Sequence, residues 1–357
     1  MPRQARESVL SMGFLGPSGP RPESLGFVDL RSNENPFAGR YRRYPEHSPD
    51  FLAPLYLAAL EVLDPPPPRA EGGGGRHLQA DVAITRGATE ALDLLLRALF
   101  EPGRDAVAVT WPSFGSFEQF AALHGVTRHR LPLGGVRYDR LDVDRLLSLP
   151  VKGIYLCNPN NPTSTCLDPD DLALLLDRFD GIVIVDETYA EFTGRPSLAH
   201  RLGSHPGLVS VRSMSKALGM AGLRLGAVLG APDLVGAVRR VRPPFPVPGP
   251  VAEAAAAELA DHAQLVSRVA SCVAERDRLA KELADCPGVR DVFADAGFVT
   301  VRLADQDAVL AELDTSRIAV HAEPEGWRGF LRISVGTPQE NALLLSAVRR
   351  SDRRSHL

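Results

Sequence analysis

The sequence of 357 residues contains no long hydrophobic run. No window offers about 18 consecutive apolar residues, which is close to the length that a membrane-spanning helix needs. Residues 1–23 also contain no apolar core of the length found in a signal peptide. We therefore expect a cytoplasmic protein with neither a membrane-spanning segment nor a secretory leader.

Cysteine is scarce, and charge of one sign does not accumulate along the chain. Cys157, Cys166, Cys272 and Cys286 form no close C-x-x-C pair, and no histidine lies near them at metal-ligand spacing. This pattern favours reduced thiols and argues against a metal site. The formal net charge is −4, which argues against nucleic acid or an anionic membrane as a partner.

Short apolar, β-branched runs alternate with helix-like stretches from about residue 80 onward. The runs lie at 106–110, 153–157, 182–186, 208–212 and 225–229, and helix-like stretches lie at 89–100 and 168–179. Strands that are apolar on both faces and separated by helices are typical of parallel sheets with both faces covered. The pattern predicts an α/β fold with a large domain whose central, mostly parallel sheet is covered by helices.

The two ends of the chain have a different character. Residues 1–40 are rich in Gly, Pro and Arg and lack periodicity, which indicates an arm, and 63–77 has the composition of an exposed, mobile loop. Beyond the proline-rich stretch we expect a helix from Val251 to about Ala284, strands at 298–303, 317–320 and 330–335, and a final helix at 338–350. We therefore divide the chain into an arm (1–40), a large ligand-binding domain (41–248) and a smaller α+β C-terminal domain (249–357).

Polar side chains follow two of the expected strands. Asp186 ends one apolar run, Tyr189 comes three residues later, and Asn161 lies in the loop after another run. Ligands bind beyond the carboxyl ends of strands in open parallel sheets, so these side chains could reach one crevice. Each also has a simple structural explanation, Asp186 as a cap or turn residue and Asn161 as a turn former.

A helix start and a lysine segment both suit a phosphate. Ala88 and Thr89 follow Gly87 at the start of a predicted helix, where free N–H groups bind phosphate well, although a simple helix cap would look the same.

The stretch "SMSKALGMAGLRLG" combines two hydroxyl groups, one lysine and one arginine among small residues. Ser213 and Ser215 precede Lys216, and Arg224 follows it by eight residues. Two hydroxyls and a guanidinium can hold a phosphate. A lysine buried beside them would have a lowered pKa and become nucleophilic. The alternative is an exposed loop lysine, the common fate of this residue type.

Taken together, these segments resemble the fold type I pyridoxal-5′-phosphate enzymes of aminotransferase class I and II, and most closely the histidinol-phosphate aminotransferase branch. The matching motifs occur in the family order and cover about residues 30–345. They are "SNENPF" (32–37), "RRYPE" (42–46), "RGATEAL" (86–92), "WPSFGSF" (111–117), "NPNNPT" (158–163), "DETYAEF" (186–192), "SMSKALGMAGLRLG" (213–226) and "LRISVGTPQEN" (331–341).

The resemblance implies a role for each candidate in binding pyridoxal 5′-phosphate. Lys216 would form the Schiff base with the cofactor aldehyde, and Asp186 would pair with the pyridinium nitrogen so that the ring can act as an electron sink. The remaining contacts are to the phosphate, the ring hydroxyl and the ring face. They fall on Ser213, Ser215, Arg224, Ala88 and Thr89 for the phosphate, on Asn161 and Tyr189 for the hydroxyl, and on Phe114 for the face.

The resemblance also implies an assembly and a reaction. Tyr44 would reach the phosphate in the neighbouring subunit of a homodimer with shared active sites, whereas Arg332 and Asn35 would bind the substrate. Arg332 can hold a carboxylate with two parallel hydrogen bonds. The reaction would be the transfer of an amino group between an L-amino acid, or a related amine, and a 2-keto acid.

Some positions depart from the family pattern and concern the substrate. Ser164 replaces the glycine usual after "NPT", residues 1–40 contain no tyrosine, and His321 stands where an arginine is expected. Glu323 and Glu325 add negative charge nearby, which would repel a phosphorylated substrate and favour a neutral or basic one.

Three alternatives stay within this fold, one of them a cofactor-dependent oxidase or cyclase of secondary metabolism, and one alternative lies outside it. A decarboxylase similar to threonine-phosphate decarboxylase shares most of the motifs, and so does a histidinol-phosphate aminotransferase proper. A transcription regulator with an aminotransferase-like domain would need a DNA-binding domain before the arm, and the residues before "SNENPF" show no helix-turn-helix pattern.

Overall fold

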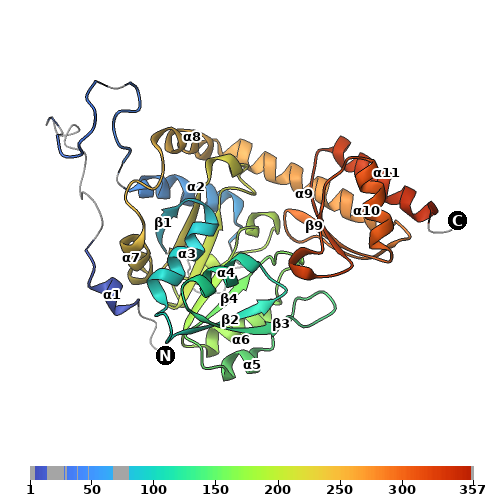
Figure 1. Ribbon diagram of the computed structural model, residues 1–357, viewed down its shortest axis with the longest axis horizontal. Coiled ribbons are helices and arrows are strands. Elements are labelled where there is room, and N and C mark those ends of the chain that lie inside the picture. The colour runs from blue at the N-terminus through green and yellow to red at the C-terminus, as the bar shows by residue number, and fades with distance from the viewer. Residues whose placement is uncertain are drawn as a thin grey trace.

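The computed structural model describes residues 5–13, 28, 30–37, 39–46, 48–66 and 80–354. Figure 1 shows a large domain around a central sheet and a smaller domain at the C-terminal end, joined by a long helix. Most of the loop expected at 63–77 lies outside the described residues. Within the described part of the chain, no helix is both long enough and apolar enough to cross a membrane.

The central sheet has seven strands in the order β1-β7-β6-β5-β4-β2-β3. Strand β7 runs antiparallel to both neighbours, and the pairs from β6 to β3 are parallel. The strands are β1 (Asp81–Thr85), β2 (Ala106–Trp111), β3 (Thr127–Pro132), β4 (Gly153–Cys157), β5 (Ile182–Asp186), β6 (Leu208–Ser213) and β7 (Gly226–Gly230). All five predicted runs are strands, although β7 begins one residue later than expected, and the mostly parallel sheet is confirmed.

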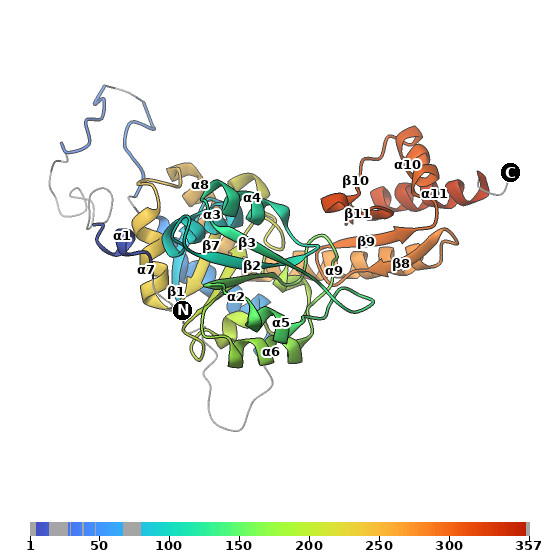
Figure 2. The same cartoon turned by 60° about the horizontal axis from the view of Figure 1, so that its bottom comes forward.

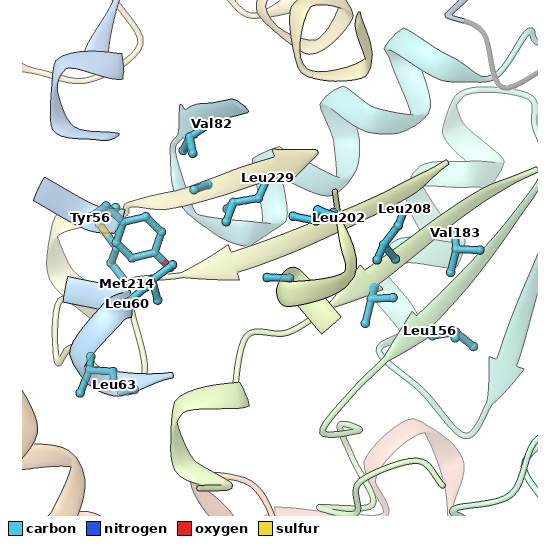
Figure 3. Packing of buried hydrophobic residues seen from close by; sticks show 14 of the residues in the cluster. Tyr56, Leu60, Leu63, Val82, Leu156, Val183, Leu202, Leu208, Met214 and Leu229 are labelled. Carbon is cyan, nitrogen blue, oxygen red and sulfur yellow. The ribbon is translucent and has the colours of Figure 1, made fainter. Parts of the chain in front are cut away.

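Alternate residues of the strands enter two cores, because successive side chains point to opposite faces of a sheet. In β5, Val183 and Val185 join one core, and Ile182 and Ile184 join the other. Figure 3 shows part of the first core, where Tyr56 and Leu60 pack near the strand residue Leu229. Burial on both faces explains why these strands read as continuous apolar runs.

Helices cover each face of the sheet. The first core is closed by α2 (Ala53–Leu63), α5 (Val143–Ser148), α6 (Pro169–Arg178) and α8 (Gly249–Ala260). The second core is closed by α1 (Glu7–Leu10), α3 (Gly87–Leu99), α4 (Gly115–Leu123) and α7 (Pro232–Val241). Short 3₁₀ turns occur at Pro49–Leu52, Ala190–Phe192, Leu198–Arg201, Ala221–Leu223 and Pro324–Gly326.

The single helix expected from Val251 to Ala284 is wrong, because two helices occupy this region. Helix α8 ends at Ala260, and α9 runs from His262 to Ala284. Asp261 separates them, and its side chain accepts a hydrogen bond from the backbone N–H of Gln264. An aspartate that caps a new helix competes with helix continuation, so the break has a local cause that the apolar pattern does not reveal.

The smaller domain is an antiparallel four-stranded sheet with helices on it, as Figure 2 shows from a second side. Its elements are β8 (Val289–Phe293), β9 (Phe298–Leu303), α10 (Gln306–Thr315), β10 (His321–Ala322), β11 (Phe330–Ser334) and α11 (Pro338–Arg354). The expected strand at 317–320 is wrong. Arg317 has φ = +55°, a left-handed backbone that interrupts an extended run.

The boundaries of the three segments stay predictions, but the packing bears on them. Within the arm, Val9 is 2% exposed against the large domain, and Arg6 forms an ion pair of 3.2 Å with Glu101. At the other boundary, α8 and the start of α9 contribute to the first core of the large domain, whereas Leu279 and Leu283 belong to the core of the small domain.

Candidate active site

A cavity of about 220 Å³ lies beyond the carboxyl edge of the sheet, where β4, β5 and β6 end. It gathers the side chains expected to bind the cofactor, apart from that of Tyr44, together with Arg332 of the small domain. The lining residues are Ala88, Thr89, Phe114, Cys157, Asn161, Asp186, Thr188, Tyr189, Ser213, Ser215, Lys216, Arg224 and Arg332.

Asp186 is a buried carboxylate held by three hydrogen bonds. One oxygen accepts from the backbone N–H and the hydroxyl of Thr188, at 3.0 and 2.5 Å, and the other accepts from the Tyr155 hydroxyl at 3.3 Å. Burial raises the pKa of Asp186, while the Thr188 bonds and the charge of Lys216 act in the opposite direction. The bonds to Thr188 are those of a turn residue, so the structural explanation and the site position both apply to Asp186.

The start of α3 and the Arg224 segment form one cradle. Gly87 begins α3 with φ = +80°, and no side chain caps the helix. A Cβ atom at Gly87 would lie 2.9 Å from Nη2 of Arg224, and one at Gly226 would lie 2.6 Å from the Ala88 nitrogen. The glycines therefore let the guanidinium and β7 approach the free N–H groups of the helix, which suits an anion.

Two hydroxyls complete the cradle. The Arg224 Nη1 donates to Ser215 Oγ at 3.2 Å, and Ser213 Oγ accepts from the Ser215 N–H at 3.2 Å. Arg224 itself adopts a left-handed backbone at the end of a 3₁₀ turn. Helix amides, two hydroxyls and one guanidinium are a set of donors that fits a phosphate group.

Lys216 lies in the wall of this cavity and is exposed in the single chain, which differs from the buried position considered from the sequence. The pKa of Lys216 is nevertheless lowered by removal of water from its ammonium group and by the charges of Arg332 and Arg224, whereas Asp186 raises it. The two guanidinium groups act on the pKa in the same direction as the partial burial. Its Nζ lies 5.9 Å from the Tyr189 ring centroid.

Asn161 and Arg332 meet across the two domains. Arg332 Nη1 donates to Asn161 Oδ1 at 2.6 Å, and its guanidinium lies 5.7 Å from the Phe298 ring. Tyr189 contacts the same phenylalanine edge to face at 5.1 Å, and burial raises the pKa of its hydroxyl. The small domain therefore brings an anion-binding side chain to the cavity of the large domain.

Ser164 is a second contact between the domains. It adopts φ = +56°, the left-handed region that favours glycine. Its buried hydroxyl donates to the Phe298 carbonyl at 2.7 Å and accepts from the Ala296 N–H at 3.1 Å. The serine in place of the usual glycine thus ties the loop that carries Asn161 to the small domain.

Tyr44 and Asn35 do not line the cavity of their own chain. Tyr44 is half exposed and stacks on Phe245 with ring centroids 4.6 Å apart. Asn35 is exposed and accepts a hydrogen bond from the Phe37 N–H at 3.0 Å. Their roles in cofactor and substrate binding stay predictions.

Two lining residues, Cys157 and Thr188, were not predicted. Cys157 ends β4 and pairs in register with Asp186, and Thr188 lies two residues after it. Cys157 lies beside Asp186 in the sheet and Thr188 lies near it in the chain, and these positions could have identified both as lining residues. Burial raises the pKa of the Cys157 thiol well above its ordinary value, so this cysteine is a neutral wall residue.

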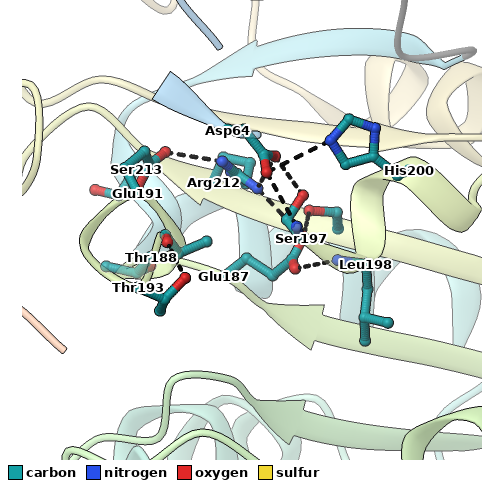
Figure 4. Close-up of polar contacts among 12 residues, drawn as sticks. Asp64, Glu187, Thr188, Glu191, Thr193, Ser197, Leu198, His200, Arg212 and Ser213 are labelled. Atoms are coloured by element: carbon teal, nitrogen blue, oxygen red, sulfur yellow. Dashed lines mark hydrogen bonds and ion pairs between the residues drawn. The ribbon is translucent and has the colours of Figure 1, made fainter. Parts of the chain in front are cut away.

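A buried ionic cluster lies behind the cavity and was also missed (Figure 4). Arg212 is fully buried and contacts the carboxylates of Asp64, Glu187 and Glu191 at 3.4, 3.4 and 2.9 Å. Burial raises the pKa of both glutamates. Because Arg212 precedes Ser213 and Glu187 follows Asp186, the cluster fixes the two strand ends that carry the site.

The residues present fit pyridoxal 5′-phosphate. The cradle offers donors for a phosphate, Asp186 offers a buried carboxylate for a ring nitrogen, and Lys216 offers an amine of lowered pKa. A Cβ atom at Gly87 or Gly226 would collide with atoms of the cradle. The cradle therefore stays open because both positions are glycine.

Known proteins share this sequence pattern over most of its length. A family model described as aminotransferase class I and II matches residues 75–348. The chain is 38% identical over 356 residues to the histidinol-phosphate aminotransferase of Stenotrophomonas maltophilia (strain R551-3), which covers 94% of this chain and 93% of that relative.

Solved structures share the fold. A histidinol-phosphate aminotransferase from Sinorhizobium meliloti in complex with pyridoxal-5′-phosphate has a TM-score of 0.73 and 22% identity, covering 91% of this chain and 90% of that one. An L-threonine-O-3-phosphate decarboxylase from Porphyromonas gingivalis has a TM-score of 0.68 and 22% identity, covering 87% and 93%. The predicted fold type I architecture is confirmed.

Proposed function

Because this chain belongs to the aminotransferase class I and II family and is a pyridoxal-phosphate-dependent enzyme, we propose that its amino donor is an L-amino acid or related amine with a neutral or cationic side chain. The acceptor is a 2-keto acid, and the reaction occurs in the cavity around Lys216. Three groups of residues carry the proposal: the phosphate cradle, the Lys216–Asp186 pair and Arg332.

The cofactor would be held at its two ends. Ala88, Thr89, Ser213, Ser215 and Arg224 would hold its phosphate at the cradle. The remaining wall would hold the ring, with Asp186 toward the ring nitrogen, Asn161 and Tyr189 toward the ring hydroxyl, and Phe114 against the ring face. When bound here, the cofactor supplies an aldehyde that reacts with amines and a ring that withdraws electrons.

The side chains of this protein perform the proton transfers and the positioning. The lowered pKa of Lys216 favours its neutral amine, whose Nζ can accept the α-proton of the substrate and return a proton. Arg332 binds the substrate carboxylate through two N–H groups. A positively charged ring nitrogen beside Asp186 would favour its carboxylate form and so oppose the effect of burial on its pKa.

The observation that carries the assignment of Lys216 is its position between the cradle and Asp186. The chain has two other lysines. Lys152 is buried and forms an ion pair of 3.0 Å with Asp105, and Lys281 lies on α9 away from the cavity. Borohydride reduction of the holoenzyme followed by peptide mapping should therefore place the pyridoxyl group on Lys216. Label on Lys152 or Lys281 instead would refute the assignment.

The substrate preference rests on the edge strand beside Arg332. His321 is paired in register with Arg332, and side chains of paired residues share one face of a sheet. Glu323 follows at the turn and does not line the cavity. Its nearest cation, Arg328, is 91% exposed at 3.8 Å, and such a surface pair is weak. A negative charge thus remains at the end of this edge strand.

Histidinol phosphate is the second candidate donor. It is favoured by the names of the curated relatives and by Arg328, which offsets part of the charge of Glu323. Values of kcat/KM for histidinol phosphate, histidinol, arginine and a neutral amino acid should be compared with one keto acid. A neutral or cationic donor should give the higher value, and an advantage of tenfold or more for histidinol phosphate would reverse the proposal.

The comparison of products separates transfer from decarboxylation. An aminotransferase releases a keto acid and leaves an equivalent amount of new amino acid, whereas a decarboxylase releases CO₂. We expect a stoichiometric keto acid and no CO₂.

We also propose that the enzyme is a homodimer in which Tyr44 reaches the partner's cradle. Several apolar side chains near Tyr44 lie exposed in the single chain, as a subunit interface would require. Phe37 is 95% exposed and Tyr41 is 71% exposed.

A further inference from the structure

A second cavity of about 350 Å³ lies on the α6 side of the sheet, behind the active-site loops. Its wall is formed by the loop after β4, by α6, and by the segment that follows Asp186. None of its lining residues is shared with the cavity around Lys216. Its volume is within the range of about 300–1,000 Å³ that small-molecule sites occupy.

The wall of this cavity is mainly apolar. Pro159, Leu167, Leu172, Ala190 and Leu198 supply much of it. Figure 4 shows Leu198 below the Arg212 cluster, with His200 directed toward Asp64, 3.5 Å away. An apolar wall favours a ligand with a hydrocarbon body, because burial of apolar surface stabilises the complex by about 25 cal/mol per Å².

The charged groups in the wall leave a positive potential. Arg195 and Arg201 both line the cavity. The single lining carboxylate, that of Glu187, is directed inward, where it accepts from the Leu198 N–H at 2.7 Å and from the Ser210 hydroxyl at 2.6 Å. The buried guanidinium of Arg212, 3.4 Å from Glu187, offsets the charge of that carboxylate.

The two arginines are weakly neutralised. Arg201 lies 3.8 Å from Asp177, whose side chain is 65% exposed, and it contacts His205 at 3.0 Å. Arg195 is exposed, and its charge acts on the Cys166 thiol, whose pKa burial raises to about 12. A guanidinium beside an apolar wall is suited to a carboxylate that is attached to an apolar body.

We propose that this cavity binds a small organic anion, with its apolar body against Leu172 and Leu198 and its carboxylate on Arg195 and Arg201. The cavity is bounded by Pro159, two residues before Asn161, and by Ala190, one residue after Tyr189. A ligand here therefore contacts the two loops that carry Asn161 and Tyr189 without entering the cavity around Lys216. The site is a regulatory one, at which occupancy fixes the two loops that carry Asn161 and Tyr189.

The probe for the test is 2-naphthoate, with the neutral 2-naphthamide as its uncharged counterpart. Calorimetric titration of the holoenzyme measures binding directly and does not depend on turnover, so failure of this proposal is distinguishable from failure of the assigned reaction. Arg332 in the active site could also bind the carboxylate of 2-naphthoate. Loss of binding in the Arg332→Gln variant would therefore show that the probe binds there. We expect 2-naphthoate to bind at least tenfold more tightly than 2-naphthamide, and equally well to Arg332→Gln.

Variants in the wall complete the test. Arg195→Gln should weaken 2-naphthoate binding about tenfold, since one charge-assisted contact is lost, while Arg178→Gln removes a surface arginine outside this cavity and should have no effect. Ala173→Trp should fill the cavity, whereas Leu174→Trp places the same ring at a neighbouring position that is 44% exposed. Binding that is lost in Arg332→Gln but kept in Arg195→Gln would overturn the proposal, as would no binding to the unmodified holoenzyme.

Discussion

Lys216 combines an exposed position with a lowered pKa, which has two causes: partial removal of water from its ammonium group comes first, and the charges of two arginines add to it. Arg332 comes from the small domain and Arg224 from the cradle, and both disfavour a further positive charge on Nζ. The cofactor and substrate anions that bind these arginines would offset their charge. The fraction of Lys216 in the neutral amine form therefore depends on Arg332 and Arg224, which are also the side chains expected to bind the substrate and the cofactor.

Removal of the Arg332 charge should raise the pKa of Lys216. We expect Arg332→Gln to shift the pH dependence of Lys216 acetylation in the cofactor-free protein to higher pH, because the ammonium form becomes more favourable. Peptide mass spectrometry after acetic anhydride treatment measures this, with Lys281 as the internal reference. An unchanged or lower midpoint would show that Arg332 does not act on Lys216, and Arg178→Gln serves as the remote control.

Ser164 offers a test of the contact between the domains. Ser164→Ala loses two buried hydrogen bonds, each worth about 0.5–1.5 kcal/mol, so the free energy of unfolding should fall by roughly 1–3 kcal/mol. Ser164→Gly loses the same bonds but relieves a left-handed backbone that costs about 1–2 kcal/mol in other residues. Urea unfolding should therefore show Ser164→Gly as the more stable of the two variants, and the reverse order would contradict the assigned backbone strain.

At the scale of elements, the strand ends were predictable and the breaks were not. Runs such as 153–157 and 182–186 are buried on both faces, so their apolar character is continuous and visible in the sequence. The break at Asp261 and the left-handed backbone of Arg317 each depend on a single residue. The spacing of apolar residues, from which helices and strands are predicted, does not reveal such single positions. The resemblance predicts roles for Asn161 and Arg332, but it does not predict their hydrogen bond, which joins two residues 171 positions apart in the chain.

The packing of β7 against the start of α3 decides the geometry of the cradle. Gly226→Ala would place a Cβ 2.6 Å from the Ala88 nitrogen, so α3 or β7 must move. We expect the dissociation constant for pyridoxal phosphate to rise by roughly tenfold or more, because a charge-assisted hydrogen bond contributes about 1.5–3 kcal/mol and 1.4 kcal/mol is tenfold in affinity.

The matched control for this change lies at the other end of the same strand. At Gly230 the nearest atom to an added Cβ would be 3.5 Å away, an ordinary contact. Gly230→Ala should therefore bind the cofactor as the unchanged protein does, as followed by cofactor absorbance during dialysis. Equal loss in both variants would mean that the strand as a whole, and not the cradle, is affected.

At the scale of the whole molecule, the exposure of Tyr44 and its absence from the cavity of its own chain predict a shared site. If Tyr44 acts in the partner's site, Tyr44→Ala and Lys216→Ala should each be nearly inactive alone. In a hybrid dimer, one site carries both changes and the other carries neither. Random exchange of subunits should then restore about a quarter of the original activity.

The control for subunit exchange is the mixture of Lys216→Ala with Asp186→Ala. Both of these residues line the cavity of their own chain, so no hybrid site is intact and no activity should return. Sedimentation analysis of the same mixtures measures the dimer fraction. Failure of the Tyr44→Ala mixture to regain activity in samples that are dimeric would place Tyr44 outside the partner's site.

The hydrogen bond between Arg332 and Asn161 has a consequence for the speed and tightness of substrate capture. A free arginine side chain carries about 2 kcal/mol of rotamer entropy, which a ligand normally has to suppress as it binds. Here the amide oxygen of Asn161 and the Phe298 ring already restrict the guanidinium. The conformational freedom of the anion-binding group is therefore lost once, when the polypeptide folds, and not again at every turnover. A carboxylate arriving at Arg332 meets a preorganised receptor.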